Sequence, residues 1–136
     1  NLSPIPNLKE ELKIKETQNF NSRLEVALQY TQEQFALYTS EKDLEYLCEY
    51  VIKYSRKEKI ESVKPIVVHT LSNIDLYHFG WNIWEHFGKR HQDEIAFFLK
   101  AVFAGSFVDA GAKTIKSHLK DDESKGIIKI RKDLTA

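Results

Sequence analysis

The apolar residues of this chain recur at a spacing that an α-helix gathers onto one side. Between residues 41 and 57 they fall at positions i, i+3, i+4, i+7 and i+8: Leu44, Leu47, Cys48, Val51 and Ile52. Residues 93–104 carry a similar stripe: Ile95, Phe98, Leu99, Val102 and Phe103. Such a stripe is typical of a helix that packs on a core. Because there are only 5 glycines and 3 prolines in 136 residues to interrupt helices, the sequence predicts a mainly α-helical protein.

Start and stop signals divide the chain into about six helices. Ser40 and Ser72 are suited to cap helix N-termini, and each is followed three residues later by an aspartate. Gly88 is suited to end the helix that Ser72 begins. The expected helices span residues 8–17, 20–38, 41–57, 73–87, 93–104 and 112–120, after an extended lead-in over residues 1–7.

Two segments favour extended backbone. Residues 63–70 are rich in β-branched side chains and contain Pro65, which suits an edge strand. Ile128 and Ile130 alternate with Lys129 and Arg131, as in a strand with one face inward. We expect residues 63–68 and 127–131 to pair as a minimal β element. The expected organisation is a helical N-terminal region (1–62) and a winged-helix-like or helix-turn-helix-like C-terminal region (63–136), or one compact domain that contains both.

Positive charge is concentrated at the C-terminal end. The whole chain is formally neutral, with 20 basic and 20 acidic residues. Residues 112–136 carry seven basic and four acidic groups, a net charge of +3, whereas residues 1–62 (nine and eleven) and 63–111 (four and five) are slightly acidic. A local basic patch is the electrostatic feature that nucleic-acid binding requires.

The helix expected at residues 112–120 has the two sides that a recognition helix needs. Ile115 and Leu119, four residues apart, provide a side that docks on the core. The remaining residue types make phosphate and base-edge contacts in DNA complexes. The predicted nucleic-acid-binding residues, here called the basic unit, are Lys113, Thr114, Lys116, Ser117, His118, Lys120, Lys129 and Arg131.

Residues 113–119, KTIKSHL, resemble the recognition helix of LuxR-type regulators, in which a Thr-Val-Lys-x-His-Leu run is common. The resemblance covers seven residues. The Ile95-Ala96 pair lies further from Thr114 than the compact spacing of that family requires, so the chain is not assigned to it.

The chain shows no sequence signature of catalysis, metal binding or membrane insertion. His78 and His86 are eight residues apart, not the four of a helical zinc site, and there is no glycine-rich phosphate loop or serine-nucleophile motif. The single cysteine excludes an internal disulfide. We expect no cofactor, no metal, no enzymatic activity and no membrane role, and a cytoplasmic location. The chain has no methionine and begins at Asn1, so we also expect it to be part of a longer product.

Two functional hypotheses follow. The first is a small non-enzymatic nucleic-acid-binding or regulatory protein, with DNA as its partner. The alternative is a helical protein–protein interaction module without a nucleic-acid role. Its contact would be the stripe of Tyr46, Tyr50 and Tyr54, the aromatic helix at residues 73–87, or a homodimer through the N-terminal helices. An open face that holds all the basic residues would favour the first, and a face interrupted by residues 121–123 would favour the second.

Overall fold

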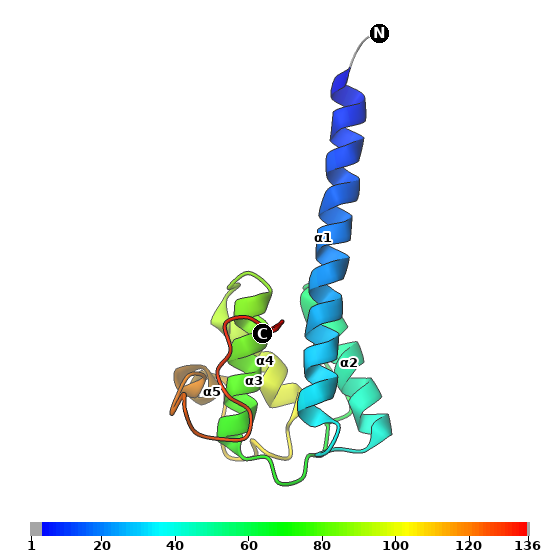
Figure 1. The fold of residues 1–136 in the computed structure, drawn as a ribbon. Helices are drawn as coiled ribbons and strands as arrows, with labels where there is room; N and C mark the ends of the chain where they lie inside the picture. Colours follow the sequence, from blue (N-terminus) through cyan, green and yellow to red (C-terminus); the bar gives the residue numbers. More distant parts are fainter. Residues whose placement is uncertain (1–3, 136) are drawn as a thin grey trace.

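The computed structural model describes residues 4–135, with the side chains of residues 7–135, and this part of the chain holds five helices and no strand (Figure 1). The prediction of a mainly α-helical protein is confirmed. The helices are α1 (Pro4–Phe35), α2 (Glu41–Ser55), α3 (Asn73–His86), α4 (Gln92–Val102) and α5 (Ala112–His118).

The predicted count of six helices is wrong because the first two are one continuous helix, α1. Residues 7–35 contain neither glycine nor proline, so nothing in the sequence breaks the helix near residue 18. The extended lead-in is also wrong for residues 4–7, which are helical, while residues 1–3 lie outside the described residues. Proline is tolerated in the first helical turn, where its missing N–H has no intrahelical acceptor to lose.

The expected caps are in place on α2 and α3. Ser40 accepts a hydrogen bond from the backbone N–H of Asp43, and Ser72 and Asp75 form a complete capping box. α3 ends at His86 and is followed by Gly88, whose φ of +95° is the left-handed conformation that favours glycine.

A cluster of phenylalanines joins the helices into one core. The Phe35 ring of α1 lies 4.8 Å from that of Phe79 of α3 and 5.7 Å from that of Phe103, at the end of α4. α3 and α4 approach closely at Gly80, where an added Cβ would stand 2.5 Å from the Leu99 side chain. Because Gly80 has no side chain, Leu99 fills that space.

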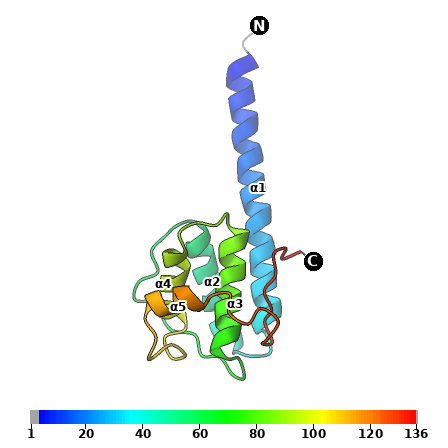
Figure 2. The same ribbon diagram turned by 90° about the vertical axis from the view of Figure 1, so that its left-hand side faces the viewer.

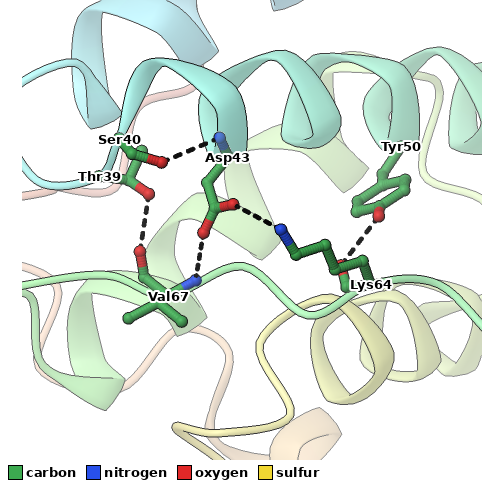
Figure 3. Close-up of polar contacts among 6 residues, drawn as sticks. All are labelled: Thr39, Ser40, Asp43, Tyr50, Lys64 and Val67. Atoms are coloured by element: carbon green, nitrogen blue, oxygen red, sulfur yellow. Dashed lines mark hydrogen bonds and ion pairs between the residues drawn. The ribbon is translucent and has the colours of Figure 1, made fainter.

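Residues 63–69, here called the crossing segment, run past α2 in extended form without joining a sheet (Figure 3). The Asp43 carboxylate accepts the Val67 N–H at 3.0 Å, and Thr39 donates to the Val67 carbonyl at 2.7 Å. Tyr50 donates its hydroxyl to the Lys64 carbonyl at 2.8 Å. Side chains of α2 and of the turn before it therefore satisfy several backbone polar groups of this segment, and the Ile66 and His69 N–H groups bond to the Val102 and Tyr38 carbonyls.

Residues 121–131, here called the C-terminal segment, lie beside α3 (Figures 1 and 2). Side chains of α3 hold this segment through hydrogen bonds. Asp75 Oδ1 accepts the N–H groups of Ile127 at 2.6 Å and Ile128 at 2.9 Å. Asn82 accepts the N–H of Arg131 at 2.7 Å and donates to the Lys129 carbonyl at 2.8 Å.

His78 completes this attachment between the other two side chains. Its Nδ1 lies 2.8 Å from the Ile128 carbonyl oxygen and its Nε2 2.6 Å from that of Asp121. A neutral imidazole carries one N–H and donates to only one of these acceptors, whereas the imidazolium form donates to both. Asp75, His78 and Asn82 are spaced i, i+3, i+7, so they share one face of α3 and act together as a polar ladder.

The predicted β element and wing are therefore absent from the described residues. No backbone hydrogen bond joins residues 63–68 to residues 127–131 in this part of the chain. The physical reason is that several N–H and C=O groups that a sheet would use are already bonded elsewhere, those of Val67 to Asp43 and Thr39 and the Ile66 N–H to the Val102 carbonyl. Gly126 supports this arrangement, because its φ is +85° and an added Cβ would stand 2.6 Å from Asp75 Oδ1.

Candidate functional site

The docking side predicted for α5 is buried. Ile115 is fully buried and Leu119 is 2% exposed. Lys113, Thr114, Lys116, Ser117 and Lys120 are exposed and His118 is partly buried. α5 therefore has one side in the core and one polar side, although it is only seven residues long.

Acidic side chains interrupt the polar side of α5. Lys116 Nζ lies 3.1 Å from an Asp93 carboxylate oxygen, and Lys120 Nζ lies 3.8 Å from one of Glu123. His118 Nδ1 lies 2.5 Å from Asp121 Oδ2. The basic residues of α5 therefore do not form a continuous positive face.

The other two basic residues of the basic unit contact different parts of the molecule. Lys129 donates to the Ser124 carbonyl at 2.6 Å. The Arg131 guanidinium lies 5.2 Å from the centre of the Tyr30 ring of α1 and donates to the Leu134 carbonyl at 3.1 Å. Arg131 is thus directed toward α1, while Lys120 lies 5.0 Å from the centre of the Trp81 ring of α3.

The two aromatic surfaces expected to contact a partner are largely covered within the chain. Tyr50 and Tyr54 are 4% and 2% exposed, and Lys64 of the crossing segment lies over the ring of Tyr46. On α3, Phe79 is fully buried and Trp81 is 6% exposed. The crossing segment therefore covers part of the tyrosine stripe.

The first half of α1 is the uncovered helical surface. Residues 7–19, here called the projecting half, are all exposed and extend beyond the other helices in both views (Figures 1 and 2). Leu8, Leu12 and Ile14 are each about half exposed, at 52%, 50% and 53%. A helix was predicted over residues 8–17, but no sequence pattern indicated that it would project from the body of the protein.

A cavity of about 580 Å³, here called the Tyr54 cavity, lies where the end of α2 and residues 57–61 meet α4. Its size falls in the range of small-molecule sites. The lining residues that matter for its chemistry are Tyr54, Lys57, Ile60, Arg90, Phe97 and Phe98. Sequence analysis missed it because these residues come from separate segments. One signal was available: Phe97 lies outside the apolar stripe of its helix and is 63% exposed.

Tyr54 has an unusual environment in this cavity. Its hydroxyl is buried and has no hydrogen-bond partner, the only such side-chain atom among the described residues. Burial raises the pKa of Tyr54 to about 12, with Arg90 opposing the rise and Glu94 adding to it. The Arg90 guanidinium stacks 4.0 Å from the ring centre and pairs with Glu94 at 3.1 Å.

Tyr30 provides a contrast, because its buried hydroxyl is satisfied. Burial also raises the pKa of Tyr30 to about 12, and a hydrogen bond from Asn82 opposes the rise. The Asn82 amide donates to this hydroxyl at 2.6 Å. An unsatisfied buried hydroxyl is uncommon and calls for an explanation.

The described part of the chain contains no cluster of side chains suited to bind a metal ion, and its one cysteine is not activated. No three His, Cys, Asp or Glu side chains lie where they would hold a metal ion. Cys48 is half-buried, and burial raises the pKa of its thiol, which lowers its reactivity. No helix in the described range is long and apolar enough to cross a bilayer.

Comparisons with known proteins add no family to this geometry. No protein-family model, no curated protein and no solved structure matches the chain.

Proposed function

We propose that this protein is a non-enzymatic helical interaction module that pairs with a second copy of itself through the projecting half of α1. The observation that carries the proposal is that every residue from 7 to 19 is exposed in an otherwise packed molecule. A helical stretch of this length without tertiary contacts is only marginally stable in water. Pairing would cover Leu8 and Leu12, which lie four residues apart on one face.

Charges beside these leucines favour an antiparallel pair. With about 100° per residue, Lys9 and Glu16 lie on one flank of the Leu8–Leu12 face, and Glu11 and Lys15 lie on the other. In an antiparallel pair each flank meets the same flank of the second copy. Lys9 would then face Glu16, and Glu11 would face Lys15, in both directions. A parallel pair would place Glu11 beside Glu16, which is repulsive.

The shape of the molecule leaves room for this pair. The projecting half is about 20 Å long at 1.5 Å per residue. Overlapping two projecting halves in opposite directions would place the two bodies at opposite ends, as the position of α1 suggests (Figure 1). Because few apolar side chains are involved, the interface would be small and the dimer weak.

Sedimentation equilibrium between about 5 µM and about 500 µM tests the proposal over the range expected for a weak complex. The expected result is an average mass that rises from one chain toward two. Lys9→Glu should weaken association about fivefold, because residue 9 of each copy would then face Glu16 of the other copy with the same charge. Adding Glu16→Lys should restore association. Lys113→Glu on α5 is the matched control and should have no effect. A constant single-chain mass, or equal association of all variants, would contradict self-pairing.

DNA binding remains a prediction as a second candidate function, favoured by the buried Ile115 and Leu119 beneath exposed lysines. It predicts that random duplex DNA binds at low salt and is released as salt rises. Replacing Lys116 and Lys120 by Glu should abolish this binding in an anisotropy titration. Affinity that does not respond to those substitutions would exclude the basic unit as the contact.

A further inference from the structure

The Tyr54 cavity combines an apolar wall with an unused hydrogen-bond donor. Phe98 is buried behind it, Ile60 is partly buried at its edge, and Phe97 is largely exposed beside it. Covering Phe97 would remove apolar surface from water, which is favourable. The Tyr54 hydroxyl is buried just behind the cavity surface and has no partner, so a ligand oxygen reaches it once the side chains that cover it, Arg90 among them, move aside.

Unpaired charge around the cavity is mainly positive. Its lining includes four basic and three acidic side chains. Glu94 is paired with Arg90, and Glu61 lies 3.9 Å from Lys59. The remaining basic side chains, Lys57 and Lys100, have no carboxylate partner among the described residues, and Lys100 donates to the Phe107 carbonyl. Glu58 is the one acidic lining residue outside these ion pairs, so the unpaired side chains that line the cavity carry a net charge of +1.

The backbone at the cavity is held in an uncommon conformation. Lys57, which lines the cavity, has a φ of +60°, and Lys89, next to Arg90, has a φ of +56°. Lys57 directly follows the C-cap of α2, and the bonds from its N–H to the Tyr54 carbonyl and from the Glu58 N–H to the Lys53 carbonyl are those of a left-handed helix end. These two bonds position Lys57 at the edge of the cavity.

We propose that the Tyr54 cavity binds a small amphiphilic carboxylate, with its apolar body against Ile60, Phe97 and Phe98 and its carboxylate toward the Tyr54 hydroxyl and Lys57. This activity is independent of self-pairing through α1. The positive excess at the rim selects an anion over a cation, and the apolar wall selects a ligand with a hydrocarbon or aromatic body over a simple anion.

Decanoate is a suitable probe, with decanol as its neutral analogue and decyltrimethylammonium as its cationic one. Titration is followed by calorimetry and by backbone amide NMR, below the concentration at which each amphiphile aggregates. Decanoate is expected to shift the amides of residues 57–61, 90 and 97–101 in a saturable manner. Decanol should bind more weakly, and the cation should not bind at this site.

Three variants assign the contacts. Phe97→Ala should weaken decanoate binding about tenfold by loss of apolar area. Tyr54→Phe should weaken it about fivefold by loss of the hydroxyl donor. Lys57→Gln should weaken it about threefold and reduce the preference for decanoate over decanol.

The matched controls are Val108→Ala, an exposed apolar residue that does not line the cavity, and Lys113→Gln, an exposed lysine on α5. Both should bind decanoate as the parent protein does. Because Phe97 is mostly exposed, Phe97→Ala is expected to fold normally, so a loss of binding in that variant is informative. Shifts spread over the whole surface, equal binding of decanol or of the cation, or unchanged affinity in Tyr54→Phe and Phe97→Ala would overturn the proposal.

Discussion

The crossing segment and the C-terminal segment are both held to a helix without a neighbouring strand, but the C-terminal segment is held by more hydrogen bonds. Neither belongs to a helix or a strand, and both attach through the carboxylate at the third position of a capped helix, Asp43 of α2 and Asp75 of α3. Asp43 accepts one backbone N–H and pairs with the exposed Lys64. Asp75 accepts two backbone N–H groups and also closes its own capping box. A helix-capping aspartate can therefore take the place of a neighbouring strand, and its energetic importance depends on how many donors it serves.

The largest effect is expected for Asp75→Asn. An amide has one acceptor oxygen in place of two, so either the Ile127 and Ile128 N–H groups or the Ser72 groups would face an NH₂ donor in a buried site. Charge-assisted bonds would also be lost, and the free energy of unfolding should fall by about 3 kcal/mol. Urea unfolding checks this value, and amide exchange should show residues 127–131 opening first.

If Asp75→Asn changes the free energy of unfolding by no more than Asp43→Asn does, the two segments are held equally. The proposed ranking would then be wrong. Asp93→Asn is a suitable control, because that carboxylate pairs only with Lys116 at the surface.

An intermediate effect is expected from alkaline pH through Tyr30, which supports the C-terminal segment by way of Asn82. Burial raises the pKa of Tyr30 to about 12, against about 10 in an unfolded chain. Between these values the folded state holds the proton that the unfolded state has lost, so stability falls as pH rises. The fall is about 1.4 kcal/mol per pH unit for this tyrosine, complete near pH 12.

Urea unfolding at pH 9, 10 and 11 measures this dependence in the parent protein and in Tyr30→Phe. The variant should lose the part of the slope that Tyr30 contributes. Absorbance at the tyrosinate band should show Tyr30 and Tyr54 ionising last. An unchanged slope in Tyr30→Phe would show that this hydroxyl is not protected by folding.

A smaller effect is expected for Asp43→Asn. The new amide oxygen can still accept the Val67 N–H. The variant loses the 3.7 Å ion pair with Lys64, and its bond to Val67 is no longer strengthened by a negative charge. Because Lys64 is exposed, the loss of stability should be about 1 kcal/mol. Urea unfolding measures it, and a fall as large as that of Asp75→Asn would remove the distinction between the segments.

The sequence predicted those parts of the fold that depend on neighbouring residues. Ser40, Ser72 and Gly88 mark helix ends through local hydrogen bonds and backbone conformation, and the apolar stripes mark the buried sides of α2 and α4. The attachment of the C-terminal segment depends on contacts over some fifty positions, from Asp75 to Ile128. An available signal was the polar set Asp75, His78 and Asn82 on one face of an otherwise apolar helix.

The candidate sites were harder to predict for the same reason. The docking side of α5 follows from two residues four apart, and it is buried as expected. The carboxylates that interrupt its polar side include Asp93 from another helix. The Tyr54 cavity needs α2, α4 and the loop at residues 57–61 to come together, which no local pattern specifies.

The smallest effect on stability is expected for Tyr54→Phe. It is compared with Tyr50→Phe, which removes a hydroxyl that is hydrogen-bonded to the crossing segment. Tyr50, one helical turn earlier, donates to the Lys64 carbonyl of the crossing segment, so Tyr50→Phe should cost about 1 kcal/mol. The Tyr54 hydroxyl is buried without a partner, so its removal ends an unfavourable desolvation while the ring remains in place. Tyr54→Phe should therefore leave the free energy of unfolding unchanged or raise it by a few tenths of a kcal/mol. Paired urea-unfolding curves of the two variants test this difference, and a destabilised Tyr54→Phe would mean that its hydroxyl already has a partner in the free protein.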